Sequence, residues 1–250
     1  MESTIQIIGI EGLPEIRPGD DVAEQVLRAA AQAGLTFQQG DVLVIAQKII
    51  SKAEGRLVSL NDIEPSEFAR AIATTMNKDA RIVEIVLRES KRIVRMDRNV
   101  MIVETHHGFV CANAGVDQSN VAGGWVSLLP RDPDGSAARI RQQLAQAVGI
   151  DLAVIISDTF GRPWRQGLVE VAIGVAGLHP LMDYRGLQDS YGYILQASVV
   201  AIADELAAAA GLVFGKTNGI PAAVIRGYRF TPALGSAKTL LRPADRDLFR

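Results

Sequence analysis

Residues 41–50 read DVLVIAQKII, and this stretch decides the fold class. Its first half runs from Val42 to Ile45 without a polar residue, which predicts a strand that other elements cover on both faces. Gln47 and Lys48 follow at the exit of this strand. The chain therefore places polar and charged groups directly after a buried strand.

Further strand and helix patterns alternate on both sides of this run. The apolar spacing predicts strands over residues 5–10, 100–104, 109–112, 152–156 and 222–225, and helices over residues 65–76, 80–90 and 136–148. Another helix follows Asp20 and Asp21, which can cap it. We expect an α/β to α+β fold with mixed sheets and packed helices. It forms one domain over residues 1–250, with a hinge or subdomain boundary near residues 130–135.

Composition excludes several classes of protein. A chain of 250 residues that is 48% hydrophobic is long enough to bury a sizeable core. Its 26 basic and 28 acidic residues give a net charge of −2 without a basic segment, which argues against nonspecific nucleic-acid binding. Cys111 is the only cysteine, so no intrachain disulfide is possible, and we expect it to be a buried small hydrophobe.

The most apolar stretch covers residues 193–214, but Gln196, Asp204 and Glu205 interrupt it. Because charges are costly near the middle of a bilayer, the stretch predicts a buried helix and not a membrane span. Residues 1–10 lack the pattern of a secretory signal. We therefore expect a cytoplasmic protein that does not bind membranes.

Residues 112–120 read ANAGVDQSN and follow a predicted strand. They offer a carboxylate, a hydroxyl and amides in a glycine-containing loop, which are oxygen ligands suited to Mg²⁺ or Mn²⁺. Asp117 alone can hold such an ion when phosphate oxygens and water complete the shell. An Asx turn without any ligand explains the same loop.

Residues 157–165 read SDTFGRPWR and follow the predicted strand 152–156, so we place them at the carboxyl end of that strand. Asp158 and Thr159 are candidate metal ligands, while Arg162 and Arg165 are candidates to bind phosphate or a carboxylate. The alternative is a strand-end cap with two solvated arginines and a packed Trp164.

Two other segments carry cations near predicted loops. Lys48 and Lys52 are suited to neutralise phosphate charge, although a solvated lysine pair is an alternative. Residues 211–217 read GLVFGKT, which fails as a P-loop because three residues, not four, separate the glycines. A nucleotide-contacting loop remains open there. His106, His107 and His179 lack the spacing of zinc ligands.

Taken in order, residues 12–16, 48–55, 113–120, 157–167 and 215–221 resemble the coenzyme F-420:L-glutamate ligase family. Each segment is weak by itself, and their order and spacing over nearly the whole chain make the resemblance specific. It implies the family-specific ligase fold and the stand-alone form, without a C-terminal nitroreductase-like domain. It also implies a homodimer.

The resemblance assigns roles to residues of this chain. Asp117, Asp158 and Thr159 match ligands of two divalent ions, Mg²⁺ or Mn²⁺, with a monovalent cation such as K⁺ as an addition. The residues that match the GTP site are Leu13, Pro14, Glu15, Ile16, Gln47, Lys48, Lys52, Asn120, Gly215, Lys216, Thr217 and Gly219. Gln47 and Lys48 stand where many relatives carry small hydroxyl residues, and Lys216 stands in a loop that often carries an acidic one.

The resemblance also implies the reaction. GTP phosphorylates the carboxylate of the coenzyme F-420 precursor, and the amine of L-glutamate then attacks the acyl phosphate to form an amide; further γ-linked additions can follow. Lys48 and Lys52 would position the triphosphate, and Arg162 and Arg165 would hold a substrate carboxylate. A metal-dependent phosphohydrolase and a noncatalytic deazaflavin carrier are the alternatives.

Overall fold

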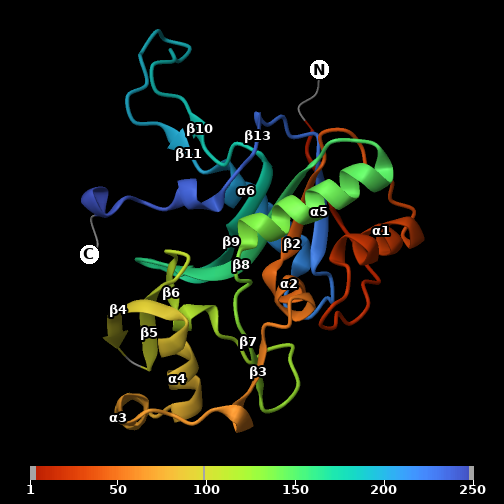
Figure 1. Ribbon diagram of the computed structural model, residues 1–250. Helices are drawn as coiled ribbons and strands as arrows, with labels where there is room; N and C mark the ends of the chain where they lie inside the picture. Colours follow the sequence, from red (N-terminus) through yellow and green to blue (C-terminus); the bar gives the residue numbers. More distant parts are fainter. Residues whose placement is uncertain (1–3, 98, 248–250) are drawn as a thin grey trace.

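A six-stranded mixed sheet forms the centre of the computed structural model, which describes residues 4–97 and 99–247 (Figure 1). Its strands are, in spatial order, β1 (Gln6–Gly9), β12 (Ala222–Arg226), β2 (Val42–Ala46), β8 (Ala153–Arg162), β9 (Arg165–Leu178) and β13 (Pro232–Ala233). Strands β2 and β8 are parallel, and every other neighbouring pair in this sheet is antiparallel. The predicted mixed α/β architecture is confirmed.

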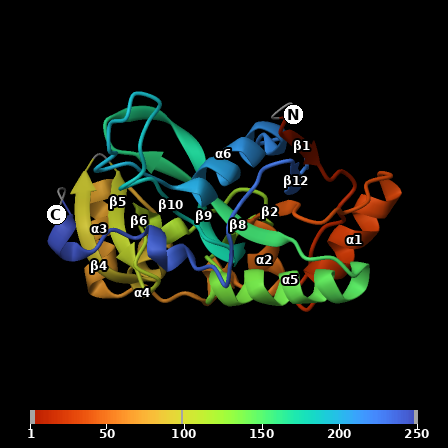
Figure 2. The same cartoon turned by 90° about the horizontal axis from the view of Figure 1, so that it is seen from above.

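Helices cover both faces of this sheet (Figure 2). Helices α1 (Val22–Gln32), α2 (Gln47–Ala53) and α5 (Pro133–Val148) contribute to one buried cluster, and α6 (Ile202–Phe214) contributes to the other. Alternate residues of β2 point to opposite clusters. Leu43 and Ile45 belong to the first, and Val42 and Val44 to the second. The continuous apolar run is therefore a strand buried on both faces, as its sequence predicts.

A smaller body extends from this sheet, in orange and yellow at the lower left of Figure 1. It contains α3 (Glu67–Met76), α4 (Ala80–Arg88) and an antiparallel sheet of β4 (Ser90–Asp97), β5 (Val100–Thr105) and β6 (Val110–Ala112). Val83, Met101 and Val103 lie in its own buried cluster. Strands β3 (Leu57–Ser59) and β7 (Trp125–Ser127) pair where the chain leaves and re-enters the main body. The predicted hairpin between β5 and β6 is confirmed.

The structure corrects the expected extent of the helix in the most apolar stretch. Helix α6 covers only residues 202–214, whereas residues 193–201 belong to a protruding arm that includes β10 (Met182–Asp183) and β11 (Val199–Val200). Tyr193 in this arm is 61% exposed, so its apolar character does not reflect burial. Residues 130–135, where a hinge or subdomain boundary is expected, contain the start of α5, with Asp132 as its N-cap and Pro133 at its first position.

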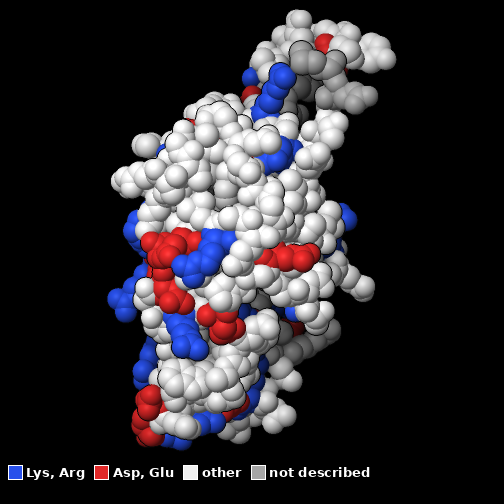
Figure 3. Space-filling view, turned by 90° about the vertical axis from the view of Figure 1, so that its right-hand side faces the viewer, with Lys and Arg blue, Asp and Glu red and all other residues white. Residues whose placement is uncertain are grey.

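Two features bear on the expectations about partners. No helix in the described part of the chain is long and apolar enough to cross a membrane. Basic and acidic side chains lie interspersed on the face shown in Figure 3. Residues 1–3 of the segment examined for a signal, and Arg250 at the chain end, lie outside the described residues.

Candidate functional site

A cavity of about 780 Å³ lies between the main sheet and the smaller body, within the usual size of small-molecule sites. Its wall brings together five segments that are distant in sequence: residues 13–16, α2, residues 111–120, the β8–β9 hairpin and residues 214–221. Every residue that the resemblance assigned to GTP or metal lines this cavity. Arg162 and Arg165 do not line it.

Helix α2 presents two lysines to the cavity because Lys48 and Lys52 are four residues apart on one helix face. Lys48 Nζ donates hydrogen bonds to Asp117 Oδ2 at 2.5 Å and to the Ser119 carbonyl at 2.7 Å. Lys52 forms an ion pair with Glu15, which also lines the cavity. The chain enters α2 directly from β2, so both ammonium groups stand beside the end of a buried strand.

The loop that carries Asp117 depends on an unusual backbone. Asn113, Ala114 and Gly115 all have positive φ, at 52°, 55° and 70°. A Cβ atom on Gly115 would lie 2.7 Å from Leu129 Cδ2, so only glycine fits at this position. Asp117 then exchanges two backbone hydrogen bonds with Ser127, which fixes the start of its side chain.

Asp117 forms the Asx-type turn that was one of its two interpretations, and its second oxygen faces a lysine. Its Oδ1 accepts the Ser119 N–H at 2.8 Å, which is an Asx-type turn, while its Oδ2 faces Lys48. Burial alone would raise the pKa of Asp117, but hydrogen bonds from Lys48 and Ser119 outweigh it and hold the pKa below its usual value. Asp117 is therefore a charged carboxylate at the cavity wall.

Asp158 lies inside a strand and not at its end, which corrects the sequence-based placement. Strand β8 continues to Arg162 because residues 158–162 pair with β9, after a register shift between Ile156 and Ser157. The parallel pairing of β8 with β2 ends earlier, at the pair Ala46 and Ser157. Asp158 is thus the first residue after the parallel part of the sheet, and it lines the cavity.

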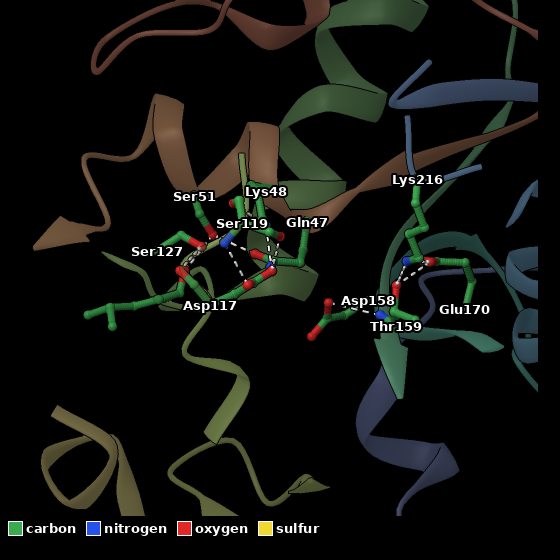
Figure 4. A network of polar contacts seen from close by, with 11 residues as sticks. Gln47, Lys48, Ser51, Asp117, Ser119, Ser127, Asp158, Thr159, Glu170 and Lys216 are labelled. Atoms are coloured by element: carbon green, nitrogen blue, oxygen red, sulfur yellow. Dashed lines mark hydrogen bonds and ion pairs between the residues drawn. The ribbon is translucent and has the colours of Figure 1, made fainter. Parts of the chain in front are cut away.

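The carboxyl group of Asp158 points toward the Asp117 and Lys48 side of the cavity (Figure 4). Burial, with the repulsion of Glu170 and Asp117, raises its pKa to about 7, although Lys48 and the Thr159 N–H act in the opposite direction. Its Oδ1 accepts the Thr159 N–H at 2.8 Å, and it makes no ion pair with any described residue. Asp158 is therefore a desolvated acid without a partner cation among these residues.

The sequence analysis missed Glu170, which lies opposite Thr159 in the β8–β9 register. Glu170 Oε2 accepts from Ser157 Oγ at 2.9 Å, and Oε1 accepts from Thr159 Oγ1 at 2.5 Å. Lys216 Nζ reaches the same group, 2.5 Å from Thr159 Oγ1 and 3.5 Å from Glu170 Oε1. A hairpin turn at residues 163–164 would by itself pair Glu170 with Ser157. The register shift between Gly161 and Arg162 moves Glu170 opposite Thr159, and predicting the hairpin alone would not have found that pair.

The donor set fits one divalent cation. Asp117 and Asp158 offer carboxylate oxygens from opposite sides, as Mg²⁺ or Mn²⁺ prefers. Among the described residues no cluster of three or more His, Cys, Asp or Glu side chains is arranged to hold a metal. Phosphate oxygens and water would have to complete the shell. Thr159 fits a second cation poorly, because its hydroxyl is already bonded to Lys216 and Glu170.

The tip of the β8–β9 hairpin lies outside the cavity. Arg162 donates to the Gln166 carbonyl at 2.9 Å, and Arg165 is exposed. Trp164 is 82% exposed with a φ of 57°, so the packed tryptophan of the alternative interpretation is wrong. Gly161 and Leu168 do line the cavity, which puts this tip beside its mouth.

Two other expectations are confirmed. Cys111 is buried, and burial, with a smaller contribution from Asp158, raises the pKa of its thiol to about 12. Residues 211–217 form no P-loop, because helix α6 ends at Phe214 and the cavity receives the loop that follows this helix.

Comparison with known proteins agrees with this arrangement. Residues 11–227 match the sequence profile of the family F420-0:Gamma-glutamyl ligase. Coenzyme F420:L-glutamate ligase from Methanothermobacter thermautotrophicus is 51% identical over 98% of this chain and 99% of its own. The proteins of the same name from Methanopyrus kandleri and Methanocaldococcus jannaschii are 47% and 42% identical, over 96% and 98% of this chain and 97% of each relative. The chain therefore belongs to the F420-0:gamma-glutamyl ligase family.

Proposed function

We propose that this protein attaches L-glutamate to a coenzyme F-420 precursor, using GTP and a divalent metal ion. One observation supports the proposal most directly. A single cavity contains all the segments expected to contact GTP, and it also places the carboxylates of Asp117 and Asp158 on facing walls. Phosphoryl transfer needs this combination of a nucleotide site and a cation site.

The proposed reaction has two steps. The γ-phosphoryl group of GTP first moves to the carboxylate of the precursor, which gives an acyl phosphate and GDP. The amine nitrogen of glutamate then attacks the acyl carbon, so that the C–N bond forms, the C–O bond to phosphate breaks, and the nitrogen loses a proton. Repeating the cycle on the new γ-carboxylate would add further glutamates.

Residues of the chain would bind and orient the reactants. Lys48 and Lys52 stand on one face of α2, where their charges would balance the phosphates and let two anions approach each other. Asp117 and Asp158 would hold a divalent ion, which would supply positive charge to offset the charge that develops during transfer. Arg162 and Arg165 would hold a substrate carboxylate at the cavity mouth, beside Gly161 and Leu168.

The test is phosphate release from GTP with Mg²⁺ or Mn²⁺, with precursor and glutamate omitted in turn. We expect release to require both, and we expect mass spectrometry of the product to show gains of whole glutamyl units. Equal release without glutamate would support the phosphohydrolase instead. Tight binding of the deazaflavin without any metal-dependent release would support the carrier.

We further propose a homodimer whose interface adjoins the active-site loops. Large apolar side chains exposed beside the cavity mouth support it, since Trp164 is 82% and Leu168 64% exposed. Light scattering at micromolar concentration should give twice the mass of the 26.8 kDa chain. Replacing both side chains with Ser should shift the mass toward one chain. A parent protein of single-chain mass would contradict the proposal.

A further inference from the structure

We propose that Lys216 is a tethered cation that fills the position of a second metal ion, so that the site holds one divalent ion where the family resemblance implies two. This inference rests on the proposed function, because it concerns the cations at the same cavity. The observation behind it is the contact between the Lys216 ammonium and Thr159, the residue expected to bind the second ion.

The loop after α6 brings this ammonium to the sheet. Gly215 ends the helix with a φ of 58°, and Lys216 then extends toward β8 and β9. Its Nζ lies 2.5 Å from Thr159 Oγ1 and 3.5 Å from Glu170 Oε1, as Figure 4 shows. The ammonium therefore occupies the space that a cation bound to Thr159 would need.

The hydrogen-bonding capacity of Thr159 leads to the same conclusion. A hydroxyl has one donor and two acceptor positions. Thr159 Oγ1 donates its proton to Glu170 Oε1 and accepts a proton from Lys216. A metal ion on the remaining lone pair would lie next to the ammonium, and the single charge of Glu170, already paired with Lys216, would have to offset both cations.

The two sides of the cavity, one at Thr159 and one at Asp117 and Asp158, differ in net charge. Glu170 and Lys216 carry opposite unit charges and make an ion pair, so the Thr159 side is already neutral. On the other side Asp117 and Asp158 share one nearby ammonium, that of Lys48, when both are ionised. The facing carboxylates thus lack one positive charge, and a divalent ion would supply it with one further charge left to attract phosphate oxygens. Only this side requires a metal ion.

The competing outcome is that a second ion displaces Lys216. The side chain of Lys216 is 67% exposed, so the ammonium has room to swing away and leave Thr159 and Glu170 to the ion. Glu170 is nearly buried, at 11% exposure, and would serve either cation equally well. A count of bound ions distinguishes these two arrangements.

The test counts bound Mn²⁺ by electron paramagnetic resonance and calorimetric titration, without turnover. We expect one Mn²⁺ per chain in the parent protein and two in Lys216→Met, which keeps the stem and removes the charge. Lys216→Met combined with Glu170→Gln should return to one. Arg165→Met, which removes an exposed cation outside the cavity, should remain at one. A series with a nonhydrolysable GTP analogue should preserve the difference of one ion between the parent and Lys216→Met.

Two results would overturn the inference: two ions in the parent protein, or no gain of an ion in Lys216→Met with either form of the titration. Both results leave the proposed ligase reaction standing. Failure of the proposed function would give a different result. Phosphate release would not depend on glutamate, while the number of bound Mn²⁺ ions would stay at one per chain.

Discussion

Replacing Asp117 with Asn should lower turnover by at least about a hundredfold, the scale seen when one charge-stabilising group is removed from an active site. Asn keeps the shape and one oxygen of the side chain, but it removes the charge that faces Lys48 at 2.5 Å. A neutral amide also binds a divalent cation less strongly than a carboxylate does. Steady-state phosphate release at saturating Mn²⁺ and GTP measures the loss.

The Asx turn at this position makes the experiment decisive. Asn accepts the Ser119 N–H as well as Asp does, so the loop should keep its shape, and the melting temperature without metal should stay close to that of the parent. Asp189 provides the matched control, because it accepts the N–H groups of Tyr191 and Tyr193 in the protruding arm. Asp189→Asn should keep full activity. Near-parental activity in Asp117→Asn would remove Asp117 from the proposed site.

Short-range patterns predicted most of the fold because they depend on local chemistry. The run from Val42 to Ile45 needs only its own side chains to indicate a doubly covered strand, and Asp21 caps α1 through the N–H of Glu24 three residues ahead. The turn between α3 and α4 likewise contains Asn77 in the left-handed conformation that asparagine tolerates.

Long-range pairing explains what the sequence did not reveal. Strand β8 continues past Ile156 only because β9 lies beside it, and residues 157–162 carry too many polar groups to predict a strand by themselves. Missing that hairpin also hid Glu170, whose role depends on its register opposite Thr159. The arm shows the opposite error, since Ile194 is apolar and 51% exposed. Hydropathy alone does not report which apolar residues the fold will cover.

For the candidate site, too, the sequence predicted which segments take part but not how their side chains contact one another. The resemblance gathered residues from five segments, and all the nucleotide and metal candidates line one cavity. It gave no contacts between them, so the bond from Lys216 to Thr159 and the pairing of Lys48 with Asp117 emerged only in three dimensions. Arg162 and Arg165 followed the motif closely in sequence, yet the hairpin carries them to its tip, past the cavity wall.

Replacing Asp158 with Asn should also lower turnover at least about a hundredfold. Unlike Asp117, this carboxyl group makes no ion pair with a described residue, and its charge is held in a buried setting that only a cation would offset. Asn at this position keeps the bond to the Thr159 N–H through its own oxygen. Bound Mn²⁺, counted by electron paramagnetic resonance, should fall together with turnover. Full Mn²⁺ binding in the variant would contradict the assignment.

Without metal, Asp158→Asn should be more stable than the parent although it is less active. The pH dependence of the stability difference tests this expectation. The folded-state pKa of Asp158 is raised from 3.8 to about 7, so the folded protein binds the proton more tightly than the unfolded chain does. The parent therefore loses stability as the pH rises from about 4 to about 7, by at most about 4 kcal/mol, and the loss is constant above that range.

The amide that replaces this carboxyl group in Asp158→Asn has no proton to lose. In EDTA, the melting temperature of Asp158→Asn minus that of the parent should rise between about pH 4.5 and about pH 8, and a difference independent of pH would show that the Asp158 carboxylate is not desolvated. Added Mn²⁺ should then stabilise the parent and leave the variant unchanged, because the buried charge that destabilises the metal-free protein is the one that binds the ion.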